Sequence, residues 1–307
     1  MKEKPEFVFF NGEIIPYENA VIHSMTPCVR YGAMVFEGLK GYWNEEKREM
    51  YVFRLEDHSK RLVQSAKLLR ISHNYTIDTI SDANLQLLKR LNYQQDVHIR
   101  QMLYVDGDGP LDSPGPAGLI SVALPRGASS KADTGLHIAV SSWLRIDDTS
   151  MPPRIKAAAN YQNGRLGKMQ AKLDGYDNVI FLNRNGKVSE GPGACFFIVR
   201  DSKLIAPTIT SSILESITRD TLLKIASEDL NIEVVERDVD RTEVYIADEA
   251  FYCGSGAEIT PVVSVDRHQL GNGKVGTLTT KLRKHYLEVT RGEINKYNKW
   301  ITPVYKK

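Results

Sequence analysis

Cysteine is scarce in this chain of 307 residues. It occurs three times, as Cys28, Cys195 and Cys253, and these residues lie far apart, without the spacing of a metal-binding cluster. A disulfide framework requires a denser and even-numbered set. The pattern therefore predicts reduced thiols, a cytoplasmic protein and no bound metal.

Long apolar runs and blocks of one charge are also missing. No stretch approaches the roughly 20 apolar residues that a membrane span requires. Forty basic and thirty-eight acidic residues leave a formal net charge of +2, with no basic block or charged tail. We therefore expect neither a nucleic acid nor a membrane as a partner. The charged start, MKEKPEF, leads straight into a strand pattern, so we also expect no signal peptide.

The composition that remains is typical of a soluble globular enzyme, with 42% hydrophobic and 25% charged residues. The length suits one large domain or two of ordinary size. Residues 126–135 lie in a polar stretch rich in small residues and without periodicity, which is typical of a linker. Both sides mix helix and strand patterns. We therefore expect an α+β protein with an N-terminal domain over 1–125 and a C-terminal domain over 136–307, the latter ending in a short basic and aromatic tail.

Local patterns predict the elements of the first half. EFVFF-NG-EIIPY is typical of a hairpin, because Asn-Gly accepts the positive φ angles of a type I′ turn. Glu56 or Asp57 is predicted to cap a helix that places Leu62, Ala66 and Leu69 on one face. A second helix is predicted over Ile80–Leu91. VHIRQMLYV alternates as a strand does, and GLISVAL closes this half.

In the second half, LHIAVSSW, IEVVERDV and EAFYCGS read as strands. NVIFLN-RNG-KVSEG and FFIVR-DS-KLIAP read as hairpins, and residues 216–230 as an amphipathic helix.

Four short segments differ from ordinary scaffold. Lys156 precedes a run of small residues, then an asparagine and Tyr161, and a helix pattern follows. Glu190 lies among glycines at the end of a strand. Ser216 begins a helix, whose free N–H groups and positive dipole favour a phosphate. YCGSGAEITPV brings glycine backbone near a possible anion. Each segment alone also has an ordinary structural explanation, as a surface lysine, a turn carboxylate, a helix cap or a turn.

Together, the four segments describe the requirements of one cofactor. Pyridoxal 5′-phosphate requires a lysine amine that condenses with its aldehyde, a carboxylate that keeps its ring nitrogen protonated, and an anchor for its phosphate. The combination therefore predicts a pyridoxal phosphate enzyme in which Lys156 is the catalytic lysine.

The order of six segments resembles the class IV pyridoxal phosphate transaminases, and most closely the branched-chain amino-acid transaminases. These segments are RYGAMVFEGLKGY, VFRLEDHSKRL, IKAAANY, SEGPGACFF, ILESITRD and YCGSGAEITPV. The resemblance covers the chain from Phe7 to about Gly273. It implies a small α/β domain and a larger β-rich domain, with the cofactor in the cleft between them. It also implies a homodimer or larger homo-oligomer.

The resemblance assigns roles to individual residues. Lys156 would form the Schiff base, Glu190 would pair with the pyridine nitrogen, and Tyr161 would bond the ring hydroxyl. The remaining cofactor contacts would come from Arg61, Leu214, Ile217, Thr218 and Ser255. The substrate contacts would come from Tyr31, Phe36, Gly38, His98, Arg100, Gly256 and Ala257, of which Gly256 and Ala257 would offer backbone N–H groups to the α-carboxylate.

The implied reaction is a ping-pong transfer of an amino group from a branched-chain L-amino acid to 2-oxoglutarate, so that the partners are small amino acids and 2-oxo acids. The chain departs from the branched-chain pattern in DGDGPLD, where the family carries a glycine-rich turn, and at His98, where a tyrosine is common. The alternatives are therefore an R-selective amine transaminase, a D-amino-acid transaminase or an aminodeoxychorismate lyase. A pyridoxal phosphate-binding protein without turnover is a further alternative from a different class.

Overall fold

The structure is a computed structural model that describes residues 4–306. The chain forms two compact units. Of the described residues, the first comprises 4–127, Ile155–Ala159 and 288–306, while the second comprises Ala128–Arg154 and Asn160–Leu287. The change after Gly127 falls inside the expected linker 126–135. The second unit differs from the expected C-terminal range 136–307, because the segment around Lys156 and the C-terminal residues pack with the first unit.

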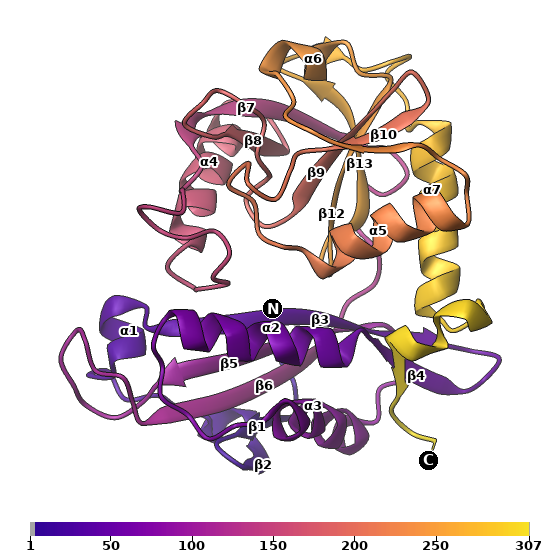
Figure 1. The fold of residues 1–307 in the computed structure, drawn as a ribbon. Helices are drawn as coiled ribbons and strands as arrows, with labels where there is room; N and C mark the ends of the chain where they lie inside the picture. The colour runs from indigo at the N-terminus through magenta and orange to yellow at the C-terminus, as the bar shows by residue number, and fades with distance from the viewer. Residues whose placement is uncertain (1–3, 307) are drawn as a thin grey trace. The chain divides into compact units, whose positions relative to one another are not determined.

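Within the described residues, the first unit is built on a seven-stranded sheet (Figure 1). Neighbouring strands in this sheet are antiparallel. The strands, in their order across the sheet, are β15 (Ile301–Pro303), β4 (Glu49–Phe53), β3 (Met34–Asn44), β5 (Val97–Val105), β6 (Ala117–Pro125), β1 (Phe7–Phe10) and β2 (Glu13–Pro16).

The first hairpin forms as the sequence predicts. β1 and β2 pair through Phe10 and Glu13, so that Asn11 and Gly12 make the connection. Their φ angles are 49° and 105°, both in the positive region that a type I′ turn requires. The sequence signal was strong here because few residues tolerate this backbone conformation.

Two helices pack against the sheet of the first unit. α2 (Leu55–Leu68) contacts β3, whereas α3 (Ile77–Leu91) contacts β1 and β6. Side chains of both helices and the facing strands form one core, which includes Leu39, Leu62 and Leu87. A short helix, α1 (Pro27–Tyr31), and a 3₁₀ turn, η1 (Tyr17–Asn19), complete the N-terminal part.

The ends of these helices differ from the prediction. α2 begins at Leu55, and its N-cap is Arg54 in the left-handed conformation, so Glu56 and Asp57 lie in the first turn instead of capping it. Leu69 follows the helix and is exposed. α3 begins at Ile77, three residues earlier than predicted, because residues 76 and 79 form a reciprocal capping box.

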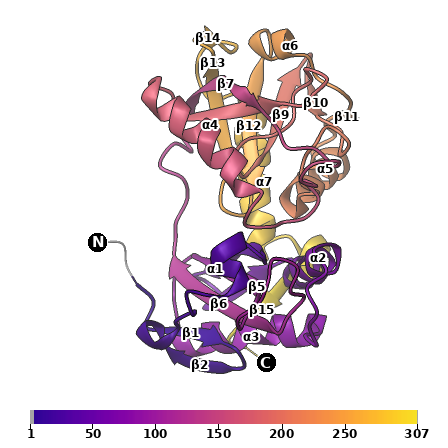
Figure 2. The ribbon, with the colours of Figure 1, turned by 90° about the vertical axis from the view of Figure 1, so that its left-hand side faces the viewer.

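The second unit contains a larger sheet, whose strands pair in the order β11-β10-β9-β12-β13-β7-β8, with β14 beside β13 (Figure 2). Helix α4 (Tyr161–Leu173) packs on β7 and β8, and α5 (Ile217–Glu228) packs on β12 and β11. The strands are β7 (Leu136–Leu144), β8 (Asn178–Leu182), β9 (Cys195–Arg200), β10 (Lys203–Ala206), β11 (Val234–Glu236), β12 (Glu249–Gly254), β13 (Glu258–Val265) and β14 (His268–Gln269). The remaining elements are α6 (Arg241–Tyr245), α7 (Thr277–Thr290) and η2 (Asn295–Trp300).

Most predicted elements of this unit form, although the bounds of several differ from the prediction. The β9–β10 hairpin turns through Asp201 and Ser202, both with positive φ. IEVVERDV contributes only the three residues of β11. The other predicted hairpin keeps one full strand, β8, and its second arm is reduced to a bridge between Leu182 and Val188.

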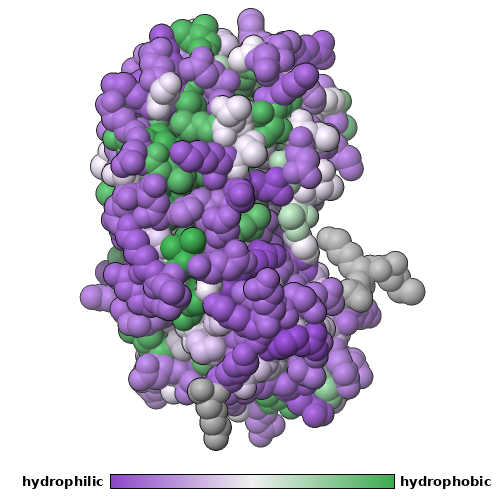
Figure 3. All heavy atoms as spheres, turned by 90° about the vertical axis from the view of Figure 1, so that its right-hand side faces the viewer, coloured by the Kyte–Doolittle hydropathy of each residue, from purple (hydrophilic) through white to green (hydrophobic). Residues whose placement is uncertain are grey.

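The described residues expose polar side chains and some large apolar ones. On the face that Figure 3 shows, hydrophilic residues predominate and hydrophobic ones form small separate patches. No helix within residues 4–306 has the length and apolar character to cross a membrane. All three cysteines are free thiols.

Candidate active site

Four of the seven expected substrate residues lie on one face of the first unit's sheet. β3 and β5 pair so that Gly38 lies opposite Arg100, and Lys40 lies opposite His98. Residues two apart on a strand share a face, and so do direct partners on neighbouring strands. Phe36, Gly38, His98 and Arg100 therefore lie on the same face, opposite to the face that α2 and α3 cover.

The side chains of Arg100 and Lys156 both lie close to the ring of Phe36 on this face. The Arg100 guanidinium carbon lies 5.9 Å from the ring centroid. Lys156 Nζ lies 5.0 Å from the same centroid. Both distances are within the range of a cation–π contact. An apolar surface thus lies next to one amine and one guanidinium.

The absence of a side chain at Gly38 leaves space for the ring of His98. A Cβ atom at position 38 would lie 3.2 Å from His98 Nε2, so glycine leaves space for the imidazole. Burial, reinforced by the cations of Arg126, Arg100 and Lys40, lowers the pKa of His98 to about 3. The imidazole is therefore neutral near pH 7, and Arg100 is a permanent positive charge on this face.

Lys156 is fixed by its backbone at the edge of β3. Phe36 N–H donates to the Lys156 carbonyl at 3.0 Å, and Val35 forms an antiparallel bridge with Ala157. Lys156 N–H donates to Ser65 Oγ on α2 at 3.2 Å. The lysine is 9% exposed, so it is not the solvated surface lysine that its sequence context alone allowed.

Arg61 lies on α2 and pairs with a residue that the sequence did not single out. Its Nε donates to Glu37 Oε1 and its Nη2 donates to Glu37 Oε2, both at 2.7 Å. His58 Nδ1 lies 2.7 Å from Glu37 Oε2. Two features of the sequence could have indicated this contact. His58 and Arg61 are three residues apart on one predicted helix, and Glu37 alternates with Phe36 along the strand.

Glu190 lies in the second unit and is 3% exposed. Arg145 Nη2 and the Leu214 N–H donate to its Oε1 atom at 2.7 and 3.2 Å. The Cys195 thiol lies 3.7 Å from Oε2. Arg145 and the Leu214 N–H thus hold one carboxylate oxygen in place, and a carboxylate is the type of group that pairs with a protonated ring nitrogen. Arg145 was missed because it stands in an ordinary strand end, SSWLRIDD.

Tyr161 is the first residue of α4, and α4 packs tightly on the loop that follows Glu190. A Cβ atom at Gly164 would lie 2.5 Å from the Pro192 carbonyl oxygen, so the helix requires glycine there. A Cβ atom at Gly193 would lie 3.2 Å from the Tyr161 ring. The second unit therefore holds Tyr161 and the Glu190 loop against each other.

The start of α5 is capped as predicted. Ser216 is the N-cap, and its hydroxyl accepts the Arg219 N–H at 3.2 Å. Ile217 and Thr218 are buried in the first turn. Arg219 is directed elsewhere, since its Nη2 donates to the Pro207 carbonyl at 2.8 Å and contacts Glu236 at 2.5 Å. The positive end of a twelve-residue helix thus begins at Ile217.

The turn between β12 and β13 contains three of the predicted site residues. Ser255, Gly256 and Ala257 form this turn, each partly exposed. The Ala257 N–H donates to the Gly254 carbonyl at 3.1 Å and closes the turn. Gly256 and Ala257 thus lie in a tight turn, and their binding of a substrate carboxylate stays a prediction.

Tyr31 is the last residue of α1. It is 40% exposed, and its hydroxyl accepts from Arg30 Nη2 at 2.6 Å. The Arg30 guanidinium also lies 4.7 Å from the ring centroid.

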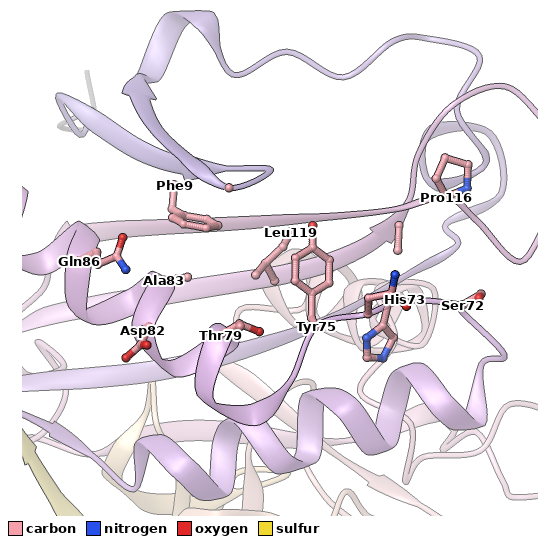
Figure 4. A pocket seen from close by; sticks show the side chains of 13 residues that line it. Phe9, Ser72, His73, Tyr75, Thr79, Asp82, Ala83, Gln86, Pro116 and Leu119 are labelled. Atoms are coloured by element: carbon pink, nitrogen blue, oxygen red, sulfur yellow. The ribbon is translucent and has the colours of Figure 1, made fainter.

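A separate cavity of about 670 Å³ in the first unit contains none of the expected site residues. It lies between the α3 start, the β1 hairpin and β6 (Figure 4). Within residues 4–306, His, Cys, Asp and Glu side chains form no group that could hold a metal ion.

Comparison with known proteins agrees with the chemistry of these donors. The family described as amino-transferase class IV matches residues 34–265, more than half of the chain. The chain belongs to this family. It is a pyridoxal phosphate-dependent aminotransferase.

Relatives of this class IV aminotransferase match along its full length. A probable branched-chain-amino-acid aminotransferase of Aquifex aeolicus (strain VF5) is 39% identical, over 98% of both chains. The branched-chain amino acid aminotransferase of Thermobaculum terrenum, solved in its pyridoxal phosphate form, is 46% identical with a TM-score of 0.92. That match covers 99% of this chain and 100% of the other. The branched-chain aminotransferase of Thermoproteus uzoniensis, solved with norvaline, is 38% identical with a TM-score of 0.93, over 99% of this chain and 100% of the other.

The donor set of this class IV aminotransferase fits its cofactor. A buried amine at Lys156 suits the aldehyde, and a buried carboxylate with its own guanidinium partner suits a protonated ring nitrogen. The guanidinium of Arg61 and the N-terminus of α5 suit a phosphate. These are the chemical types that pyridoxal phosphate requires, and each is at least partly buried.

Proposed function

We propose that this enzyme transfers the amino group of a branched-chain L-amino acid to 2-oxoglutarate. The observation that carries the proposal is the β3–β5 face, where the Lys156 amine and the Arg100 guanidinium both lie close to the Phe36 ring. An aliphatic side chain packs favourably on the ring. A second carboxylate requires a charged partner, because an unpaired buried charge is costly. The names of the relatives point to the same substrate class.

Pyridoxal phosphate, when bound, supplies the aldehyde carbon that accepts the amino group and the ring that takes up electrons from the substrate Cα–H bond. Lys156 is proposed to hold the cofactor through Nζ and, once displaced by the substrate amine, to remove the proton from the substrate Cα atom. Its backbone bonds to Phe36 and Ser65 restrict where Nζ can reach. Positioned proton transfer of this kind contributes about 10²–10⁴-fold to a rate.

The remaining assignments follow the chemistry of each side chain. Glu190 is proposed to hold the proton at the ring nitrogen, with Arg145 holding its carboxylate in place. Tyr161 is proposed to bond the ring hydroxyl, and Leu214 to pack against the ring. Arg61, Ile217, Thr218 and Ser255 are proposed to bind the phosphate. The substrate contacts proposed are Tyr31, Phe36, Gly38, His98, Arg100 and the N–H groups of Gly256 and Ala257.

Replacing Arg100 with alanine is expected to separate the two half-reactions. The guanidinium is the partner of the second carboxylate, so the glutamate and 2-oxoglutarate half-reaction should slow by about 10–100-fold, the cost of losing one charge-assisted pair. The leucine half-reaction should change less than about threefold, because a leucine side chain has no charge to pair. Stopped-flow absorbance of the cofactor measures both half-reactions in the same variant.

Arg48→Ala is the matched control for this experiment. Arg48 is an exposed arginine of the first unit that pairs with Glu45 in the turn before β4. Its removal should leave both half-reactions unchanged. Equal losses of leucine and glutamate turnover in Arg100→Ala would instead place Arg100 on the α-carboxylate or in a structural role.

We also propose that the protein is a homodimer or larger homo-oligomer and that it works in the cytoplasm. Free thiols support the second statement. Exposed apolar side chains support the first, because contiguous ones mark interfaces. They occur in one segment at Val21, Met25, Val29 and Tyr31, and along α4 at Leu166, Met169 and Leu173.

Sedimentation at assay concentration is expected to give at least twice the mass of the chain. Met169→Glu places a charge on the exposed apolar side of α4 and should shift the distribution towards monomer. Lys168→Glu, the adjacent exposed position, is the control and should leave it unchanged. A fully active wild-type monomer would contradict the proposal.

A further inference from the structure

The buried carboxylate of Glu37 has no part in the reaction assigned so far. We propose that Glu37 is a positioning residue, which holds the Arg61 guanidinium in the orientation that receives the cofactor phosphate. This inference rests on the proposed role of Arg61 in phosphate binding.

The geometry of the pair is that of a fixed bidentate contact. Both Glu37 oxygens accept from Arg61, through Nε and Nη2, at 2.7 Å. The Glu37 side chain is fully buried, and the Arg61 side chain is 12% exposed. A two-point contact to a planar guanidinium fixes its plane as well as its position. The contact therefore also fixes the direction in which the outer edge of the guanidinium, with Nη1, points.

His58 fixes the carboxylate from the other side. Burial lowers the pKa of His58, so its imidazole is neutral, and Nδ1 must carry the hydrogen that it donates to Glu37 Oε2. Burial alone would raise the pKa of Glu37, but Arg61 and then His58 outweigh it and hold the pKa well below its usual range. Glu37 is therefore a permanent anion held by three hydrogen bonds.

The position of the pair along α2 connects it to the catalytic lysine. His58, Arg61 and Ser65 are three and four residues apart, so they lie on one stripe of the helix. Ser65 Oγ accepts the Lys156 N–H at 3.2 Å. The same stripe thus fixes the Lys156 backbone and, one turn earlier, presents Arg61. A phosphate bound at Arg61 would have a fixed relation to Nζ.

A purely structural explanation accounts poorly for this arrangement. A buried ion pair is often no more stabilising than apolar side chains of similar volume, because both charges lose their hydration. Stability alone thus gives no reason for a charged pair at this point of the core. Fixing the flexible arginine before the ligand arrives does give a reason, because it reduces the ordering cost of binding.

The test compares two ligands that differ only in the phosphate. Apoenzyme is titrated with pyridoxal phosphate and with pyridoxal, and binding is followed by absorbance. Glu37→Gln keeps the size of the side chain but removes its charge and one acceptor. It should weaken pyridoxal phosphate binding by about 10–100-fold, as expected for a lost charge-assisted contact, while pyridoxal binding changes less than about threefold.

Two further variants make the result specific. Arg61→Ala should show the same loss for pyridoxal phosphate alone, and Glu37→Gln/Arg61→Ala should lose little more than Arg61→Ala, because Glu37 acts through Arg61. Glu49→Gln is the matched control. Glu49 is also fully buried in this unit, but its carboxylate accepts the backbone N–H groups of Val304, Tyr305 and Lys306. It should lower thermal stability without changing the ratio of the two affinities.

The outcomes test the role of Arg61 and the role of Glu37 separately. No phosphate-specific loss in Arg61→Ala would remove Arg61 from the phosphate site, and the inference with it. A normal Arg61→Ala result together with an unchanged or tighter affinity of Glu37→Gln for pyridoxal phosphate would overturn the role of Glu37 alone. An equal loss for both ligands in Glu37→Gln would make Glu37 structural.

Discussion

Replacing Lys156 with alanine is expected to lower kcat for transamination by at least about 10³-fold, within the range that a positioned general base contributes. The reason is that Lys156 is proposed both to attach the cofactor covalently and to move the Cα proton, and alanine can do neither. The fold should survive, because Lys156 is anchored through backbone atoms, which alanine retains. Single-turnover absorbance with L-leucine measures the chemical step directly, and methylamine in the buffer should restore part of the rate.

Borohydride treatment of the wild-type holoenzyme gives an independent result. It should attach the cofactor to the peptide that contains Lys156. Lys168→Ala, in the exposed part of α4, is the control and should keep both the label and the activity. Label on Lys168 or Lys172 would contradict the assignment of Lys156.

Glu190→Gln is expected to slow removal of the Cα proton while leaving the cofactor bound. Loss of one preorganised partner of a developing charge costs on the order of 10²–10³-fold. Glutamine is isosteric and can still accept from Arg145 and the Leu214 N–H, so the site should keep its shape. The measurement is single-turnover reaction with L-leucine and with leucine deuterated at Cα. A larger isotope effect in the variant would show that proton removal has become limiting.

Glu249→Gln is the control for this prediction. Glu249 also lies in the second unit and accepts from the first residues of α7, at Leu278 and Thr279. Its replacement should affect stability and leave the isotope effect unchanged. Proton removal at the wild-type rate in Glu190→Gln would show that the carboxylate only caps the loop in which it lies.

The sequence predicted best where local chemistry decides the backbone. The Asn11-Gly12 turn and the Ser216 cap formed at the predicted positions, because positive φ angles and unpaired helix N–H groups select few residue types. The predicted start of α2 was wrong because long-range contacts decide the backbone there. Arg54 adopts the left-handed conformation, at φ 50°, while its side chain pairs with Asp57 and its N–H bonds to Trp300. A contact 246 residues away cannot be read from a local pattern.

The site residues also divide into those that the local sequence could indicate and those that it could not. Lys156 and Glu190 could be proposed because an amine and a carboxylate at those places suit one cofactor. Glu37 and Arg145 could not, because their importance lies in the partner that the fold brings to them. Glu37 points away from the Phe36 face, towards α2, and only strand register and helix packing together reveal this. The return of Ile155–Ala159 to the first unit was equally invisible, since small residues give no periodic signal.

The measurement that tests the central claim most directly is a panel of amino donors added to the holoenzyme under single-turnover conditions. The panel contains L-leucine, L-isoleucine, L-valine, D-leucine, D-alanine and (R)-1-phenylethylamine, and the amino form of the cofactor is then returned with 2-oxoglutarate or pyruvate. The account predicts fast reaction with the three branched L-amino acids, slow reaction with the other donors, and faster return with 2-oxoglutarate. Faster reaction with D-alanine or with the R-amine, or faster return with pyruvate, would contradict it.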